Sequence, residues 1–309
     1  MTNKAVLLMG PTASGKTDVA IGLCKRFPCD IISVDSALVY RGMDIGTAKP
    51  DAQTLQRTPH QLVDIRDPEE SYSAGDFVRD ARSAIKISFA NGRIPLLAGG
   101  TMMYFRALTQ GIADLPAADA AMRQQIDSEA SRKGWPAMHA ELETIDAVVA
   151  ARLSPNDSQR IQRALEVFRL SGKPLGDWQR EAVASTGDIE FIKIALQIEP
   201  RKLLHERIEQ RLEQMIASGF EEEMQVLRAR PGLTRDSTAM RSVGYRQFWA
   251  YLDGEYSATE ARDRALFATR QLAKRQLTWL RSENDMFSVD PLEAGVKDTI
   301  SAYLINNQC

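Results

Sequence analysis

The chain has 309 residues, of which 44% are hydrophobic and 26% charged, and its formal net charge is −2. This length predicts one large domain with a smaller one inserted into it, because a chain of this size can bury a full core. The nearly balanced charge excludes a protein that binds polyanions through its overall charge, so any nucleic-acid site must be a local basic patch.

The first predicted strand, residues 5–9, is followed by a loop with a characteristic spacing. The loop consists of Gly10, Pro11, Thr12, Ala13, Ser14, Gly15, Lys16 and Thr17. It matches the pattern G-x-x-x-x-G-K-[ST], in which backbone N–H groups and the start of the next helix bind phosphate. The lysine adds a positive charge there, and the threonine hydroxyl can ligate Mg²⁺. The loop therefore predicts binding of a phosphorylated ligand, without indicating which one.

Strand-like and helix-like segments alternate along the first hundred residues. Apolar runs at 6–9, 31–34 and 95–98 are separated by helical patterns such as 77–90. This alternation predicts an α/β fold, with a P-loop-type parallel sheet flanked by helices. A polar or glycine-rich turn follows each run, and the second and third turns contain Asp35 and Thr101. Since ligands bind at the carboxyl ends of the strands in such sheets, we expect the three turns to converge on one crevice.

Asp35, directly after the second apolar run, has two possible functional roles and one structural role. Its carboxylate can hold Mg²⁺ through water, act as a general base opposite the phosphate loop, or cap a helix or turn. Its place at a strand end favours a functional role, and the position does not separate the first two. Thr101 can likewise offer a hydroxyl to the crevice or act as an ordinary helix cap.

The chain changes character after Ile112. Residues 114–187 have helical patterns without a convincing strand, and we expect them to form a helical insertion domain. The apolar run 191–198 predicts a strand that returns to the sheet, followed by a long helix that Gly219 interrupts. The predicted core domain thus comprises 1–113 and 188–309, with a C-terminal part that is mostly helical to about Arg281.

Basic residues gather in two segments. Residues 151–180 carry six basic and three acidic side chains, and residues 241–281 carry eight basic and four acidic ones. Each segment is a candidate for a basic groove, although a solvated helix face is the commoner origin of such a pattern. Arg123, Arg160 and Arg163 would cover phosphates in a small-molecule kinase or grip backbone phosphates in an RNA enzyme. The segment 241–246 has two arginines around a Gly-Tyr turn, which suits clamping or stacking on a nucleic-acid strand.

Neither a disulfide framework nor a zinc site nor a membrane span is expected. The three cysteines, Cys24, Cys29 and Cys309, contain no C-x-x-C pair, and the three histidines are scattered. The apolar run near the N-terminus is too short for a signal peptide, and no apolar stretch approaches the length of a transmembrane helix. The sequence therefore predicts a cytoplasmic protein with reduced thiols.

Taken together, these motifs resemble those of the bacterial tRNA dimethylallyltransferase (tRNA isopentenyltransferase) family. The matching segments cover nearly the whole chain: GPTASGKT at 10–17, DSALVYRGMDIGTAKP at 35–50, GGT at 99–101, QRIQR at 159–163 and RSVGYRQ at 241–247. The resemblance implies transfer of a dimethylallyl group from dimethylallyl diphosphate to the exocyclic amine of the adenosine just 3′ of the anticodon in tRNA. The target adenosine must leave its stack to react.

The resemblance also implies roles for individual residues. The diphosphate lies against Lys16 and the backbone of 12–17, with Mg²⁺ on Thr17. Asp35 accepts the proton of the amine, with Thr101 beside it. The residues implied to contact tRNA are Asp35, Ser36, Ala37, Leu38, Thr101, Arg123, Gln159, Arg160, Ile161, Gln162, Arg163, Arg241, Ser242, Val243, Gly244, Tyr245, Arg246, Lys274, Arg275 and Arg281.

The sequence departs from the family pattern at two places and leaves two other functions open. Position 38 is Leu where many relatives have Gln, and the C-terminus lacks the Cys/His zinc finger of eukaryotic relatives. An ATP-dependent kinase of a nucleotide or small metabolite would use the same loop and Asp35. A non-catalytic, nucleoside-triphosphatase-like RNA-binding module would need only the loop and the basic segments. No protein partner is indicated, and we expect a monomer.

Overall fold

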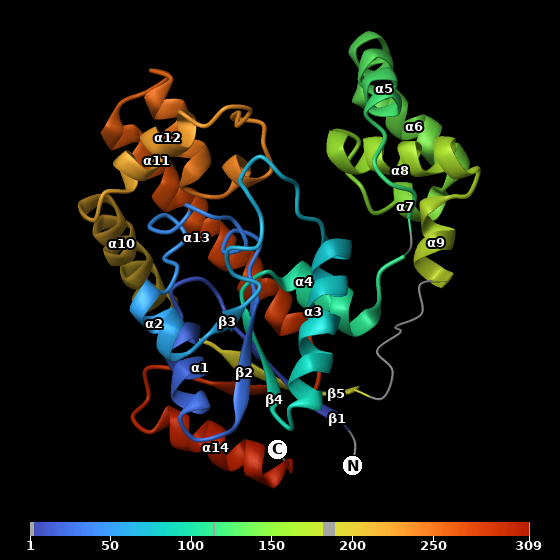
Figure 1. Cartoon of the computed structure of the whole chain (residues 1–309). Coiled ribbons are helices and arrows are strands. Elements are labelled where there is room, and N and C mark those ends of the chain that lie inside the picture. The colour runs from blue at the N-terminus through green and yellow to red at the C-terminus, as the bar shows by residue number, and fades with distance from the viewer. Residues whose placement is uncertain (1–2, 114, 182–188, 309) are drawn as a thin grey trace. The chain divides into compact units, whose positions relative to one another are not determined.

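The computed structural model describes residues 3–113, 115–181 and 189–308. The chain divides into two compact units, Met1–Thr109 with Asp188–Cys309, and Gln110–Gly187. The second unit is drawn in green in Figure 1. Its boundaries lie close to those expected for the helical insertion, 114 and 187.

The first unit is built on one six-stranded sheet, in the order β3-β2-β4-β1-β5-β6 (Figure 1). Every neighbouring pair of strands is parallel, which confirms the predicted sheet. The strands are β1 (Asn3–Met9), β2 (Cys29–Val34), β3 (His60–Gln61), β4 (Ile94–Gly99), β5 (Ile189–Leu196) and β6 (Phe287–Val289). The sequence did not predict β3 and β6, because strands of two and three residues are too short to show a periodic pattern.

Helices cover both faces of the sheet. Side chains of β1 alternate between two apolar layers, as extended backbone requires. Val6 and Leu8 lie in the layer of α1 and α14, while Leu7 and Met9 lie in the layer of α3, α4, α10 and α13. The helices of this unit are α1 (Lys16–Cys24), α2 (Ala52–Arg57), α3 (Ala74–Ala90), α4 (Met102–Gln110), α10 (Arg201–Ala217), α11 (Phe220–Arg228), the short 3₁₀ turn η1 (Ala239–Arg241), α12 (Tyr245–Leu252), α13 (Ala258–Ser282) and α14 (Val296–Asn306).

Local sequence explains where the predicted helices begin and end. Ser73 and Asp76 form a reciprocal capping box at the start of α3, so this helix begins three residues before the predicted Phe77. Gly219 has φ 98° and separates α10 from α11, as expected. The helix α14 was not predicted, because the helical pattern was followed only to about Arg281.

All the secondary structure described for the second unit is helical. Its helices are α5 (Ala120–Lys133), α6 (Trp135–Ile145), α7 (Ala147–Ala150), α8 (Ser158–Ser171) and α9 (Leu175–Glu181). It has its own core, in which Ile126, Met138, Leu142, Ile161 and Leu165 are at most 1% exposed. Across both units, none of the described helices combines the length and hydropathy needed to span a bilayer.

Candidate active site

The loop between β1 and α1 is shaped to hold an anion. Ala13 and Gly15 have φ 62° and 84°, which turns the loop back toward the first turn of α1. The N–H groups of that turn have no intrahelical acceptor, and no side chain caps them. A Cβ on Gly10 would lie 2.7 Å from Ser14 Oγ and 3.0 Å from the carbonyl oxygen of Leu196. The loop therefore requires the first glycine of the motif for space and the second for conformation.

Lys16 is turned into this loop. Its Nζ donates to the carbonyl oxygens of Gly10 (2.9 Å) and Pro11 (2.6 Å). Burial, together with the positive charge of Arg211, lowers the pKa of Lys16 to about 7, and the opposing effect of Asp35 is smaller. The hydroxyl of Ser14 is buried and has no hydrogen-bond partner among the described residues. A phosphate in the loop would supply a negative charge next to Lys16 and an acceptor oxygen for Ser14.

Asp35 and Thr101 lie at the carboxyl ends of β2 and β4. Because β4 lies between β1 and β2, the three turns meet at one edge of the sheet, as predicted. Thr101 Oγ1 accepts a hydrogen bond from Ser36 N (3.0 Å). Asp35 Oδ1 accepts from the backbone of Ala37 (2.8 Å) and Leu38 (3.3 Å). Asp35 thus caps its own turn with one oxygen, while Oδ2 forms no hydrogen bond to a described residue.

Two arginines of α10, which the sequence analysis did not single out, lie beside the loop. Arg207 Nε donates to the carbonyl oxygen of Ala13 (2.9 Å), and Arg211 Nη2 donates to that of Thr47 (3.1 Å). Burial lowers the pKa of Arg211, and Asp35 opposes this effect. Arg211 also lines a cavity of about 560 Å³ next to residues 44–52. The signal in the sequence was two arginines one helical turn apart, on the helix that follows the strand next to β1.

The side chain of Gln276 on α13 connects two of the three turns. Its Oε1 accepts from Thr12 N (2.9 Å), and its Nε2 donates to the carbonyl oxygen of Gly100 (2.8 Å). Sequence analysis missed this residue, because nothing local marks a helical glutamine that bonds to a loop 264 residues away.

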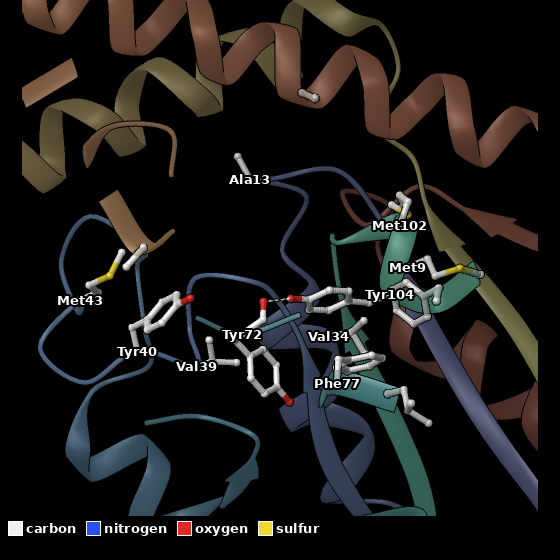
Figure 2. Packing of buried hydrophobic residues seen from close by; sticks show 14 of the residues in the cluster. Met9, Ala13, Val34, Val39, Tyr40, Met43, Tyr72, Phe77, Met102 and Tyr104 are labelled. Carbon is white, nitrogen blue, oxygen red and sulfur yellow. Dashed lines mark hydrogen bonds between the residues drawn. The ribbon is translucent and has the colours of Figure 1, made fainter. Parts of the chain in front are cut away.

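An apolar and aromatic wall lies in the same region. Figure 2 shows Tyr104 donating to the carbonyl oxygen of Tyr72, with Val34 and Phe77 beside the pair, and the rings of Phe77 and Tyr104 are stacked at 4.5 Å. Burial, with smaller effects of the nearby Tyr40 and Asp35, raises the pKa of Tyr104, so its hydroxyl stays protonated. Val34, Tyr72, Phe77 and Tyr104 are at most 4% exposed, so this wall is part of the closed core next to the strand ends.

The segment 241–246 corrects one prediction. Tyr245 was expected to contact RNA, but its ring is 0% exposed and packs edge-on against Phe220 at 5.1 Å. Its hydroxyl donates to Glu223 Oε1 (2.6 Å), and the same carboxylate accepts from the backbone N–H groups of residues 44–46 at 2.6–3.1 Å. The side chain of Tyr245 therefore holds α12 to α11 and cannot stack on a base. Gly244 is also buried, and Ser242 and Val243 are half-buried.

The five cations of the first unit that were predicted to contact tRNA remain available to a ligand. Arg241, Arg246, Lys274, Arg275 and Arg281 are all exposed. None of them forms an ion pair or a side-chain hydrogen bond with the described residues. Ser36 is exposed, and Ala37 and Leu38 are half-buried next to Asp35.

The predicted tRNA contacts of the second unit lie mainly on α8. Ile161 was expected to contact tRNA, but its side chain is 0% exposed in the core, which is incompatible with that role. Arg123 and Arg163 both donate to the buried carboxylate of Glu166, at 2.7–3.2 Å. Arg160 is exposed and pairs with Asp157 at 2.8 Å. Two further residues complete the predicted set: Gln159 is exposed, and Gln162 donates to Asp127 (2.6 Å).

The phosphate loop also offers a ligand for a divalent metal. Thr17 lies in the first turn of α1 with its side chain exposed. Within the described residues, no three His, Cys, Asp or Glu side chains are grouped so that they could hold a metal ion. Mg²⁺ takes oxygen ligands and is commonly bound by one or two protein groups together with substrate phosphates and water. A single threonine hydroxyl beside a diphosphate fits this mode of binding.

Comparisons with known proteins agree over nearly the whole chain. A family model described as IPP transferase matches residues 38–283. The tRNA dimethylallyltransferase of Thiobacillus denitrificans is 53% identical, over 97% of this chain and 96% of that protein. The protein of the same name from Stenotrophomonas maltophilia is 51% identical, over 93% and 92%.

Solved structures with the same fold include two bacterial enzymes. The tRNA isopentenylpyrophosphate transferase of Bacillus halodurans has a TM-score of 0.71 and 35% identity, covering 99% of this chain and 98% of that one. The corresponding transferase of Staphylococcus epidermidis has a TM-score of 0.71 and 30% identity, covering 99% of both chains. A eukaryotic dimethylallyltransferase acting on tRNA shares the fold at a TM-score of 0.81 with 24% identity, covering 99% of this chain and 79% of that one. By the family model and these relatives, the chain belongs to the IPP transferase family.

Proposed function

We propose that this enzyme transfers the dimethylallyl group of dimethylallyl diphosphate to the exocyclic amine of the adenosine just 3′ of the anticodon in tRNA, releasing diphosphate. Its membership of the family and its relatives' names give tRNA dimethylallyl transfer as the activity. The observation that supports the atomic roles is that an anion-binding loop follows β1 while the unbonded oxygen of Asp35 follows β2, at the same edge of the sheet and with only β4 between them.

In this proposal the loop binds a leaving group. Negative charge builds on the diphosphate as the bond between its oxygen and the allylic carbon breaks. The free N–H groups of α1, the hydroxyl of Ser14 and the ammonium of Lys16 point toward the bound diphosphate and stabilise that charge. Arg207 and Arg211 add positive potential from α10. Diphosphate binding keeps Lys16 protonated, since an adjacent anion raises the pKa of an amine.

Asp35 takes the proton. The exocyclic amine is a weak nucleophile because its lone pair is delocalised into the ring, so a nearby base is useful. Nitrogen attacks the allylic carbon, the new C–N bond replaces the C–O bond, and the electron pair of the latter leaves with the diphosphate. The proton of the amine passes to Oδ2 of Asp35, whose Oδ1 is held by the turn that Thr101 braces.

A divalent metal ion belongs to the proposal, since prenyl-transfer enzymes generally use one. We propose Mg²⁺, held by Thr17 and the oxygens of the diphosphate. Bound there, it would neutralise part of the charge that develops on the leaving group.

For tRNA, the proposal relies first on the exposed cations. Arg241, Arg246, Lys274, Arg275 and Arg281 can neutralise backbone phosphates, which positions the RNA without reading its sequence. The arginines of the second unit are a further part of the proposed contact. The target base enters the crevice by leaving its stack. A monomer working in the cytoplasm is consistent with this picture and stays a prediction.

The kinase alternative is not favoured, because the relatives that match nearly the whole chain are tRNA-modifying transferases. The RNA-binding module without catalysis is disfavoured on the same ground.

The test is incubation of the protein with labelled dimethylallyl diphosphate, Mg²⁺ and unmodified tRNA, followed by nucleoside analysis. The wild-type protein should yield a dimethylallylated adenosine. Asp35→Asn should lower kcat about 10²–10⁴-fold, the range for loss of a general base, while tRNA affinity stays within several-fold. Asp298→Asn, which removes a charge from an exposed ion pair with Arg26, is the matched control and should leave kcat unchanged. Absence of product from the wild type would refute the proposed function, and near-normal turnover of D35N would remove Asp35 as the base.

A further inference from the structure

We propose that Gln276 is a positioning residue that fixes the phosphate loop relative to the turn braced against Asp35. This inference rests on the proposed function. Gln276 belongs to α13, which enters neither turn, and its side chain is only 6% exposed. The two atoms of its amide are used on different turns: Oε1 accepts from Thr12 N at 2.9 Å, and Nε2 donates to Gly100 O at 2.8 Å.

The chemistry of the two turns selects an amide side chain. One turn presents a backbone N–H and the other a backbone carbonyl, so the side chain between them must accept on one side and donate on the other. A glutamate would face the carbonyl of Gly100 without a proton to donate, and it would add negative charge beside a diphosphate site. A methionine of similar length would leave both backbone groups buried without partners, which is costly.

Gly100 is fitted to this side chain. A Cβ at position 100 would lie 2.6 Å from Gln276 Nε2, closer than real contacts allow. The absence of a side chain at Gly100 is thus what lets the amide reach the carbonyl oxygen. The φ of Gly100 is not positive, so close approach, and not backbone conformation, accounts for the glycine.

The bridge continues to the proposed base. Thr101 follows Gly100 directly, its N–H donates to Val34 O (3.2 Å), and its Oγ1 accepts from Ser36 N (3.0 Å). A chain of short contacts therefore runs from Thr12 through Gln276, Gly100 and Thr101 to the turn that Asp35 caps. The loop that holds the leaving group and the carboxylate that takes the proton are set at a defined separation.

That separation matters for alkyl transfer, because the amine, the allylic carbon and the departing oxygen must be aligned. A misplacement of about 1 Å can reduce the rate roughly 100-fold even when the reacting groups are intact. In the bridge the N–H of Thr12 is bonded to Gln276, so it fixes the position of the loop and does not bind the ligand. The N–H groups in the first turn of α1 stay free to bind the diphosphate. Loss of the bridge should affect kcat more than the KM for tRNA, because the cations proposed to contact tRNA, including Lys274 and Arg275 on the same helix, are exposed and form no bond of the bridge.

The test compares Gln276→Met and Gln276→Glu with the wild type in steady-state dimethylallyl transfer. We expect kcat to fall about 10–100-fold in both variants, as a loss of alignment predicts, with the KM for tRNA within about threefold. Gln271→Met is the matched control. Gln271 lies on the same helix, is half-buried and forms no side-chain hydrogen bond with the described residues, so the kcat of this variant should stay within about twofold of the wild type. Thermal unfolding and circular dichroism of each variant show whether the fold is kept.

Gly100→Ala tests the bridge from its other end, also in case Gln276→Met fails to fold. Its Cβ should displace the amide and lower kcat to a similar extent, and combining it with Gln276→Met should cost little more than either change alone, as for two residues of one unit. An unchanged kcat in a folded Gln276→Met or Gly100→Ala protein would overturn the inference. A lower melting temperature with a normal kcat per folded molecule would also overturn it, because that result is expected if the Gln276 amide only stabilises the fold. A wild-type protein without transferase activity would refute the proposed function instead.

Discussion

The two basic segments of the chain have similar excess charge and use it in different ways. In the segment 151–180, five of the six basic side chains pair with carboxylates, and the sixth, Arg152, donates to a backbone carbonyl. In the segment 241–281, three of the eight, Arg262, Arg264 and Arg270, form ion pairs. The other five are exposed and have no acidic partner in the part of the chain that the structure describes.

The contrast shows that a count of charges does not measure the charge available to a ligand. An arginine bound to a carboxylate must give up that partner before it can neutralise an RNA phosphate, whereas an exposed one only releases water. Binding to RNA gains free energy from released counterions in proportion to the phosphates neutralised. Unpaired cations are therefore the better candidates for the tRNA site. The paired cations already stabilise the fold through their carboxylate partners, and binding RNA would cost them that contact.

The largest effect is expected from the unpaired cations around α12. Replacing Arg241 and Arg246 together by Gln should weaken tRNA binding about 10–100-fold at moderate salt and reduce the slope of log K against log salt by about 2. The same measurement on Arg262→Gln with Arg264→Gln, which removes two paired cations of the same segment, should change the affinity by less than about threefold. Equal losses of tRNA affinity in the two double variants would contradict the conclusion that unpaired cations contribute more to tRNA binding than paired ones.

Lys16 is a third kind of cation, paired only with loop carbonyls, and it predicts a pH effect. Its pKa of about 7 in the free protein means that the amine is largely neutral at pH 8, whereas the bound diphosphate needs it charged. Since phosphate groups are ionised by then, affinity for dimethylallyl diphosphate should fall roughly tenfold per pH unit from about 7.5 to 9. Lys16→Met should bind weakly and with little pH dependence over this range. A flat profile for the wild type would contradict the lowered pKa.

The smallest effect on RNA binding is expected from Arg163. Arg163→Gln should change the salt slope of tRNA binding by less than the loss of Arg241 or of Arg246 does. It should also lower the free energy of unfolding by about 1–2 kcal/mol, because Glu166 loses a charged hydrogen bond. Thermal unfolding and salt-dependent binding check the two parts separately. A normal stability with a slope lowered by about 1 would make Arg163 equivalent to the unpaired cations.

The carboxylate of Glu166 also makes the stability of Arg163→Gln depend on pH. Burial alone would raise the pKa of Glu166, but hydrogen bonds from Arg123, Arg163 and Asp119 N together lower it below the ordinary value of 4.5. A lowered carboxyl pKa contributes stability that is present above pH 4.5 and is lost as the pH falls through the folded-state value. The acid unfolding of Arg163→Gln should therefore begin at a higher pH than that of the wild type.

The sequence predicted the parts of the site that local pattern and sheet topology determine. The phosphate loop has a spacing of its own, and the rule that parallel strands present their carboxyl ends at one edge brought Asp35 and Thr101 to it. The sequence did not predict three other residues of the site, Arg207, Arg211 and Gln276. Their hydrogen-bond partners are far away in sequence, up to 264 residues for Gln276.

Two predicted contacts failed for another reason. A Gly-Tyr turn looks the same in sequence whether the ring faces solvent or, like Tyr245, packs on Phe220. Ile161 is an apolar residue between the polar Arg160 and Gln162, a pattern that at helical spacing is typical of a core position. The pairing of Arg163 had a signal too, since Glu166 lies three residues further along the same helix.

The division of the sheet across the chain has a consequence for protein synthesis. β1 lies between β4 and β5, and residues 110–187 are synthesised between these two strands. The second unit is one continuous stretch with its own core, so it can fold as soon as it leaves the ribosome. Until β5 is synthesised, the edge of β1 that pairs with it has no partner. The loop that follows β1 gains its bond to Gln276 later still, because Gln276 lies further toward the C-terminus. Completion of the crevice is therefore among the last steps of folding, and a nascent chain that stops short of α13 carries the phosphate-loop sequence without the bridge that holds it in place.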